Sequence, residues 1–165
     1  MAKVAIVMGS KNDFEAVKPA FEVLKKFGVT ADVRVISAHR TPHEAAEFAE
    51  NAAKNGFEVI IAAAGKAAHL AGVIASFTTL PVIGIPVKSS TMDGLDSLLS
   101  VVQMPSGIPV ACVAINGSEN AGILAAQILS LKYPELSAKL SDYKKSLSDK
   151  IKKDDQKLQD ELSAT

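Results

Sequence analysis

A histidine and an arginine lie side by side in the segment Ser37–Pro42, directly after a short apolar run and just ahead of an amphipathic stretch. An arginine guanidinium binds phosphate or carboxylate through two parallel hydrogen bonds, and an imidazole gains or loses a proton near neutral pH. His39 and Arg40 therefore predict an anion site with its own proton carrier. The alternative is a surface turn whose polar residues are incidental.

The histidines and the cysteine do not indicate a metal site. His39 and His43 have the spacing of a metal-binding pair on one helix, but Pro42 marks the first helical position and leaves His39 outside that helix. The single cysteine, Cys112, forbids an internal disulfide and lies in a predicted strand, where we expect core packing.

Two further turns have residue types suited to ligand binding. The segment Gly9–Asp13 follows a β-branched run and precedes a helix, whose free N–H groups suit a phosphate. Its polar side chains serve equally well as helix caps. The segment Gly65–Gly72 holds His69 among small residues, which let backbone approach a ligand closely. Taken alone, a histidine in such apolar company is more often structural.

These turns belong to a regular alternation of strands and helices. Apolar runs predict five strands, at 3–8, 32–36, 58–63, 81–85 and 109–115. Amphipathic or small-residue stretches predict helices at 12–27, 41–54, 67–77, 93–102 and 119–131, and a long last helix begins at Pro134. Thr41, Pro42 and Glu44 have the pattern of a capping box with proline at the first helical position.

This alternation predicts an α/β fold, a three-layer αβα arrangement around a five-stranded parallel sheet. We expect the flavodoxin-like strand order 2-1-3-4-5, followed by a long C-terminal helix. In such sheets ligands bind at the carboxyl ends of the strands, where all three turns lie.

The last helix has one apolar stripe on an otherwise charged surface. The stripe consists of Leu136, Leu140, Tyr143, Leu147 and Ile151. Residues 132–165 hold 15 of the 36 charged residues, so the body of the protein, residues 1–131, is poor in charge. The stripe packs either on its own domain or on a neighbouring subunit, and the charge-poor body favours the neighbour. We expect a catalytic domain at 1–131 and a helical extension of it at 132–165.

The composition excludes several classes of protein. In this chain of 165 residues, 18 basic and 18 acidic residues cancel, which removes a general attraction to nucleic acid or an anionic membrane. No apolar stretch approaches the ~18 residues of a membrane span, and the N-terminus lacks the pattern of a signal peptide. We expect a cytoplasmic protein of one domain.

Together these segments resemble the bacterial N5-carboxyaminoimidazole ribonucleotide mutases of de novo purine synthesis, the catalytic subunits of the phosphoribosylaminoimidazole carboxylase family. The similarity spans residues 3 to about 131. It rests mainly on Ser-Ala-His-Arg-Thr-Pro at 37–42, Ala-Ala-His-Leu at 67–70 and Asp-Ser-Leu-Leu-Ser-x-Val-Gln-Met-Pro at 96–105.

The resemblance implies an isomerase without cofactor or metal, which moves a carboxyl group from the exocyclic N5 to ring carbon C4. The family's route is decarboxylation, retention of carbon dioxide, carboxylation of C4 and loss of the C4 proton. His39 matches the catalytic histidine, which can serve as acid and then as base, and His69 matches a second active-site histidine. Small apolar groups at 64–70 suit a pocket that retains carbon dioxide.

The resemblance also implies substrate-binding residues and partners. Arg40 is expected to hold the phosphate of the ribonucleotide, while Ser10 and Asp13 contact the rest of it. Ser37 and Gly65 are expected in the pocket. The family forms octamers in which the C-terminal helix reaches a neighbour. Functional coupling to the ATP-dependent synthetase that makes the substrate is a further expectation.

Three positions and one loop depart from the family pattern, and one of these departures bears on the reaction. The loop at 116–119 looks shorter than the usual Gly-x-Ala-Gly-Ala loop of the family. Asn12, Lys66 and Ala71 replace a usual serine, glycine and proline. The related direct carboxylases, which use aminoimidazole ribonucleotide and carbon dioxide, tend to carry a basic residue at the position of Lys66. Arg40 and His69 favour the mutase, and a direct carboxylase is the alternative.

A third hypothesis comes from a different functional class. A flavodoxin-like binding module has the same predicted fold. Flavin binding usually needs aromatic stacking, whereas tryptophan is absent and aromatic residues form only 5% of the chain. A colourless purified protein would exclude a flavin carrier.

Overall fold

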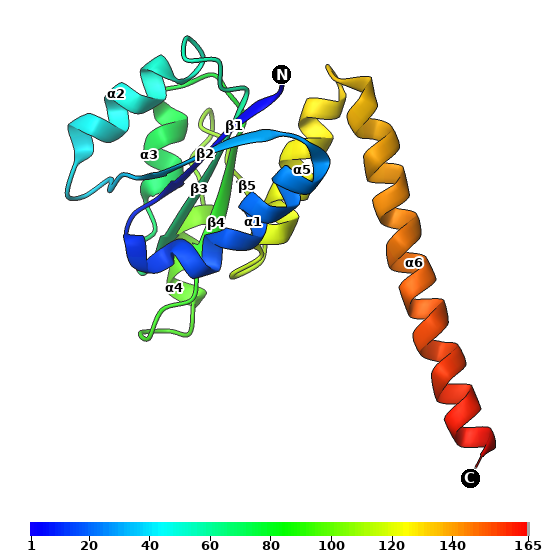
Figure 1. Ribbon diagram of the computed structural model, residues 1–165. Helices are drawn as coiled ribbons and strands as arrows, with labels where there is room; N and C mark the ends of the chain where they lie inside the picture. The colour runs from blue at the N-terminus through cyan, green and yellow to red at the C-terminus, as the bar shows by residue number, and fades with distance from the viewer. Residues whose placement is uncertain (165) are drawn as a thin grey trace.

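The chain forms three layers, with helices on both faces of a parallel sheet (Figure 1). The structure is a computed structural model that describes residues 1–164. Its strands are β1 (Lys3–Met8), β2 (Thr30–Val35), β3 (Val59–Gly65), β4 (Val82–Val87) and β5 (Ala111–Cys112). They pair in parallel in the order β2-β1-β3-β4-β5. The predicted strand order is confirmed.

A separate apolar core lies on each face of the sheet. The helices are α1 (Phe14–Phe27), α2 (Pro42–Ala52), α3 (Leu70–Ser76), α4 (Leu95–Val102), α5 (Ser118–Ser130) and α6 (Pro134–Ser163), and a short 3₁₀ helix η1 (Lys11–Asp13) precedes α1. Val4 and Ile6 of β1 pack with α1 and α5, whereas Ala5 and Val7 pack with α2 and α3. Both faces are covered, so the central strands are apolar along nearly their whole length.

Strand β5 is shorter than the predicted 109–115. Regular pairing with β4 covers only Ala111 and Cys112. Pro86 occupies the next position of β4 that faces β5, and it has no N–H to donate to the ladder. Its carbonyl instead accepts the N–H of Asn116 at 2.9 Å. The chain therefore continues beside β4 without regular strand geometry.

Helix α2 begins at Pro42 as predicted, but the predicted capping role of Thr41 is wrong. Thr41 makes no side-chain hydrogen bond into the helix, and its backbone (φ −134°, ψ 58°) lies outside the extended region typical of a cap. Its hydroxyl instead accepts the N–H of Ser37 at 3.0 Å and donates to the Ser37 carbonyl at 3.1 Å. Thr41 thus closes the turn that carries His39.

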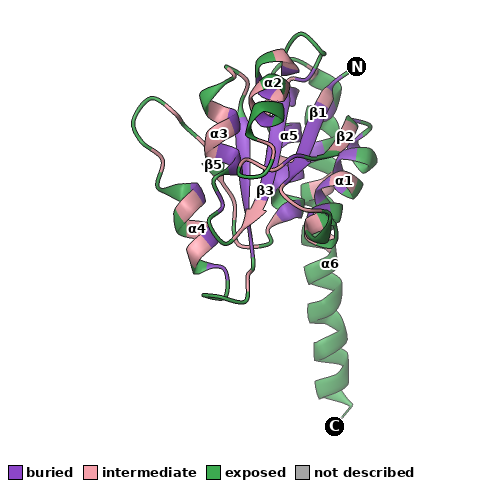
Figure 2. Ribbon diagram, turned by 90° about the vertical axis from the view of Figure 1, so that its left-hand side faces the viewer, coloured by how far each residue is buried: buried purple, intermediate pink, exposed green. Residues whose placement is uncertain are grey.

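Helix α6 begins on the body of the molecule and then extends away from it (Figure 1). Leu136 and Leu140 are buried, and Tyr143 meets Phe27 edge to face at 5.7 Å. The rest of the helix is solvent-exposed (Figure 2), and Ile151 on the predicted stripe is 67% exposed. Its own domain therefore covers only the first part of the stripe. No helix within residues 1–164 is long and apolar enough to span a membrane.

Candidate active site

The three turns chosen from the sequence meet at one edge of the sheet, where β2, β1 and β3 end. Together with residues 87–90, at the end of β4 and directly after it, they line a cavity of about 650 Å³, a size suited to a small ligand. All seven predicted site residues line this cavity: Ser10, Asp13, Ser37, His39, Arg40, Gly65 and His69.

The two histidines of the cavity are in direct contact. Nε2 of His39 lies 2.9 Å from Nδ1 of His69, and the rings meet edge to face at 5.0 Å with an interplanar angle of 86°. One ring must donate and the other accept, because a hydrogen on both facing nitrogens would break the bond. The contact between the two rings therefore places one hydrogen between the facing nitrogens. The pair can pass a proton from ring to ring, while the outer nitrogens remain open to a ligand.

Hydrogen bonds within the Ser37–Thr41 turn hold His39 in place. The Thr41 N–H donates to the Ser37 carbonyl at 2.9 Å, and the Arg40 N–H donates to Ser37 Oγ at 3.2 Å. The Ile36 N–H continues the sheet by donating to the Met8 carbonyl at 2.9 Å. His39 thus projects from a turn that is fixed at both ends, although its side chain is exposed.

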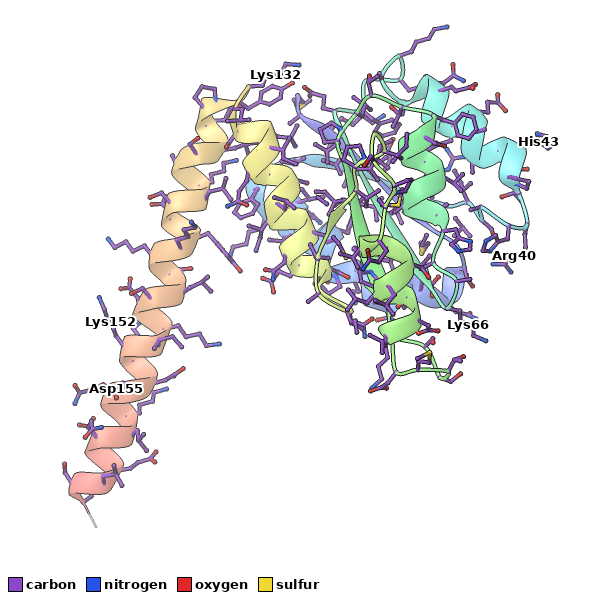
Figure 3. The ribbon with its side chains drawn as sticks, turned by 180° about the vertical axis from the view of Figure 1, so that it is seen from behind. Arg40, His43, Lys66, Lys132, Lys152 and Asp155 are labelled. Carbon is purple, nitrogen blue, oxygen red and sulfur yellow. The ribbon has the colours of Figure 1, made fainter. Side chains whose placement is uncertain are left out.

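Arg40 links two walls of the cavity. Its Nη2 donates to the Gly9 carbonyl at 2.5 Å and its Nε to Ser37 Oγ at 3.4 Å. These two hydrogen bonds orient the guanidinium. Its remaining N–H groups are available to donate to an anion. Figure 3 shows Arg40 between Lys66 and His43, on the side of the molecule away from the free end of α6, and His43 lies in the first turn of α2. His43 is not among the residues that line the cavity.

Ser10 and Asp13 combine a structural role with a place in the cavity wall. Ser10 Oγ accepts the N–H of Asn12 at 3.2 Å, and the Asp13 N–H donates to the Ser10 carbonyl at 3.0 Å. Partial burial raises the pKa of the Asp13 carboxyl, and a backbone hydrogen bond from Ser10 and the charge of Arg40 offset this only in part. The capping interpretation of this turn is correct for Ser10, and the same turn faces the cavity.

The loop between β3 and α3 brings His69 to the cavity. The backbone of Lys66 adopts the left-handed conformation, with φ of 56°. Residues other than glycine rarely adopt this conformation. The His69 N–H then donates to the Ala67 carbonyl at 2.9 Å, and α3 starts at the next residue. The tight turn at Lys66 thus sets where His69 meets His39.

Lys88, which directly follows β4, is a charged wall residue that was not predicted from the sequence. Lys88 lines the cavity, and its Nζ pairs with Asp93 at 2.7 Å. The side-chain oxygen of Asn116 accepts a hydrogen bond from the Lys88 N–H at 2.9 Å and so holds the backbone of Lys88 in place. The position directly after a parallel strand was the available signal. The loops at 103–107 and 116–120 are not part of the cavity lining.

Metal-ligating side chains are not clustered in the described part of the chain. Within residues 1–164, no three His, Cys, Asp or Glu side chains lie close enough together to hold a metal ion. Apart from the histidine pair, the cavity wall consists of hydroxyls, three cations, one carboxyl, the Asn12 amide and apolar groups, most of them small.

Comparison with known proteins identifies the family. The model of the AIR carboxylase family matches residues 3–150. The chain belongs to the AIR carboxylase family. This assignment confirms the resemblance found in the sequence, and the family match extends into α6.

Close relatives cover nearly the whole chain. An N5-carboxyaminoimidazole ribonucleotide mutase of Thermotoga maritima is 54% identical over 159 residues, which are 96% of this chain and 93% of that protein. A mutase of Saccharolobus solfataricus is 54% identical over 151 residues, 92% of this chain and 96% of that protein. The crystal structure of Treponema denticola PurE is 32% identical, with a TM-score of 0.87, and the match covers 96% and 99% of the two chains.

The three substituted positions lie in or beside the cavity. Asn12 and Lys66 line it, and Ala71 is buried at the start of α3. Ala71 therefore changes packing behind the wall, whereas Lys66 adds a charge to the wall itself.

Proposed function

We propose that this chain converts N5-carboxyaminoimidazole ribonucleotide to 4-carboxy-5-aminoimidazole ribonucleotide in purine biosynthesis. Its relatives carry the name of this mutase at 54% identity over nearly the whole chain. The observation that carries the proposal is the contact between His39 and His69 inside the cavity, because the reaction requires a group that both gives and takes a proton.

The reaction divides into two steps with balanced protons. Protonation of N5 breaks its bond to the carboxyl carbon, and carbon dioxide leaves with the bonding electrons retained on N5. C4 then attacks carbon dioxide, and loss of the C4 proton restores the aromatic ring. One proton is delivered and one is removed, so a single imidazole can act first as acid and then as base. We assign this role to His39, with His69 as the partner that shares the proton.

The remaining wall residues have separate roles in the proposal. Arg40 binds the phosphate, since its guanidinium is already oriented by Gly9 and Ser37. Ser10 and Asp13 contact the ribonucleotide. Small groups, including Gly65, surround the reacting carboxyl group and limit access of water to carbon dioxide.

Lys66 is the one observation that favours a direct carboxylase as a second candidate. The test supplies the protein either with N5-carboxyaminoimidazole ribonucleotide or with aminoimidazole ribonucleotide and bicarbonate, and compares rates of formation of the C4-carboxylated product. We expect efficient turnover of the first substrate only. Efficient use of the second at low bicarbonate would contradict the mutase assignment.

We further propose that the enzyme works as a homo-octamer in the cytoplasm, coupled in function to the ATP-dependent synthetase that makes its substrate. Two rows of exposed apolar side chains support assembly: Leu95, Leu99 and Val102 on α4, and Leu147, Ile151, Leu158 and Leu162 on α6. Exposed apolar area of this kind usually marks an interface. In this proposal residues 1–131 form the catalytic domain, and 132–165 extend it onto a neighbouring subunit.

The exposed part of α6 provides a test of assembly. We expect Leu147→Glu with Ile151→Glu to lower the native mass, measured by light scattering after size exclusion, because both side chains belong to the stripe. Lys153→Glu with Gln156→Glu is the matched control, since these residues lie on the opposite side of the helix. An unchanged mass for the stripe variant would show that α6 is not an assembly element.

A further inference from the structure

Three cations line the cavity, and they differ in their protein partners. Arg40 donates to Gly9 and Ser37, and Lys88 forms an ion pair with Asp93. Lys66 has no hydrogen bond or ion pair with any residue in 1–164, and its side chain is exposed. The positive charge of Lys66 is therefore available to a ligand in the cavity.

The backbone at Lys66 argues against an incidental surface lysine. Its φ of 56° is a conformation that glycine adopts without steric cost and other residues rarely adopt. A lysine here carries a conformational cost without any protein contact to offset it. Strained positions of this kind cluster at functional sites.

The position of Lys66 indicates which part of the substrate it meets. In the sheet order β2-β1-β3, Arg40 follows β2 and Lys66 follows β3, so roughly 10 Å of sheet separates the two strand ends. Both residues lie on the side of the molecule away from the free end of α6 (Figure 3). Lys66 is three residues from His69 in one loop, and His69 contacts His39.

We propose that Lys66 binds the carboxyl group carried by the nucleotide, which is the carbamate of the substrate and the C4 carboxylate of the product. This inference rests on the proposed function. The nucleotide has two anionic groups, its phosphate and its carboxyl group, on opposite sides of the ribose. With the phosphate at Arg40 and the proton chemistry at the histidine pair, the migrating carboxyl group lies beside the loop that holds Lys66.

This role makes Lys66 a determinant of specificity. It adds affinity for carboxylated nucleotides, one of which is the product of both candidate reactions, and leaves the affinity for aminoimidazole ribonucleotide, which lacks the anion, unchanged. Because substrate and product both carry the negative carboxyl group, Lys66 stabilises both bound states. Carbon dioxide is neutral, so Lys66 gives it little stabilisation. Because Lys66 stabilises the bound substrate more than the carbon dioxide stage of the reaction, its removal should raise KM without lowering kcat.

The test measures dissociation constants by calorimetry for the C4-carboxylated nucleotide and for aminoimidazole ribonucleotide. For Lys66→Gly, we expect about tenfold weaker binding of the carboxylated nucleotide, the usual scale for one hydrogen bond to a charged group. Binding of aminoimidazole ribonucleotide should stay unchanged. Lys66→Arg should retain the preference. Lys54→Gly, which removes an exposed charge remote from the cavity, is the control and should leave both constants unchanged.

Three results would overturn the inference. Equal weakening for both nucleotides would assign Lys66 to the phosphate. Unchanged affinity for the carboxylated nucleotide would show that Lys66 does not bind it. A lower Tm for Lys66→Gly, with both affinities reduced, would indicate a structural role, whereas we expect an equal or higher Tm. If the unmodified protein fails to turn over N5-carboxyaminoimidazole ribonucleotide, the proposed function fails, and the two affinities still show whether Lys66 recognises a carboxylate.

Discussion

Charged side chains lie at both edges of the sheet, but the two edges differ in whether other residues of the chain pair with those charges. At the amino edge, Glu58 accepts hydrogen bonds from Lys132 at 2.6 Å and from the Tyr133 hydroxyl at 2.7 Å. Lys3 pairs with Asp32 at 2.9 Å. At the carboxyl edge, Lys66 has no partner within residues 1–164 and a left-handed backbone. Charges at the amino edge are paired within the chain, whereas the carboxyl edge leaves charge available to a ligand.

The carboxyl groups of the two edges have pKa shifts of opposite sign. Burial acts to raise the pKa of Glu58, but hydrogen bonds from Lys132 and Tyr133 outweigh it and lower the pKa. Burial raises the pKa of Asp13, and its favourable contacts do not compensate. An ionised Glu58 therefore stabilises the folded state, and an ionised Asp13 costs stability. Such a cost is typical of a functional site.

The largest expected effect is that of removing the proton carrier at the cavity edge. His39→Asn should lower kcat on the order of 10³-fold, because only proton transfer is lost. The dissociation constant of the C4-carboxylated nucleotide should change little, as measured by calorimetry. His43→Asn, on α2 and outside the cavity lining, is the matched control. Near-normal turnover of His39→Asn would refute the acid-base role.

The next effect concerns the anion site. Arg40→Ala should raise the dissociation constant of the ribonucleotide on the order of 30-fold, through loss of charge-assisted hydrogen bonds to the phosphate. Arg40→Lys should be intermediate, because it keeps the charge and loses the planar geometry. A comparison of the nucleotide with its dephosphorylated nucleoside checks the assignment. If Arg40→Ala weakens both ligands equally, Arg40 does not bind the phosphate.

A smaller effect is expected at the amino edge. The lowered pKa of Glu58 adds stability that is present above its unfolded pKa and is lost as the pH falls through its folded pKa. Glu58→Gln should lower the free energy of unfolding at pH 7 by about 0.5 kcal/mol, because solvent screens this exposed pair. Urea unfolding at a series of pH values from 7 to 3.5 should show that the difference in free energy of unfolding between Glu58→Gln and the unmodified protein becomes smaller. If this difference stays constant with pH, the ion pair of Glu58 is not the cause of the loss of stability.

Asp13→Asn should shift stability in the opposite direction. The raised pKa of Asp13 means that the ionised carboxylate costs stability at pH 7, and this cost disappears as the pH falls below the ordinary value of 3.8. The variant should gain about 0.5 kcal/mol at pH 7, a value reduced for solvent exposure, while losing substrate affinity. The same series of urea unfolding experiments measures the change in the free energy of unfolding. A loss of stability at pH 7 would contradict the contrast between the edges.

The sequence predicted the strand order from the flavodoxin-like alternation of strands and helices. It also predicted seven residues that line the cavity, because turns after parallel strands meet at one edge whatever their sequence separation. Three features depend on tertiary geometry. The length of β5 depends on Pro86 in the neighbouring strand. The role of Thr41 depends on its backbone angles. The contact between His39 and His69 spans 30 residues, and no local pattern specifies the distance between the rings.

The central claim is that the cavity transfers a carboxyl group within one nucleotide. The most direct measurement supplies N5-carboxyaminoimidazole ribonucleotide with ¹³C in the carboxyl group, in buffer that contains unlabelled bicarbonate, and follows the C4 carboxylate of the product by NMR. We expect the product to retain the label, because carbon dioxide stays in the cavity between the two steps. Loss of the label to the bicarbonate pool would contradict this claim.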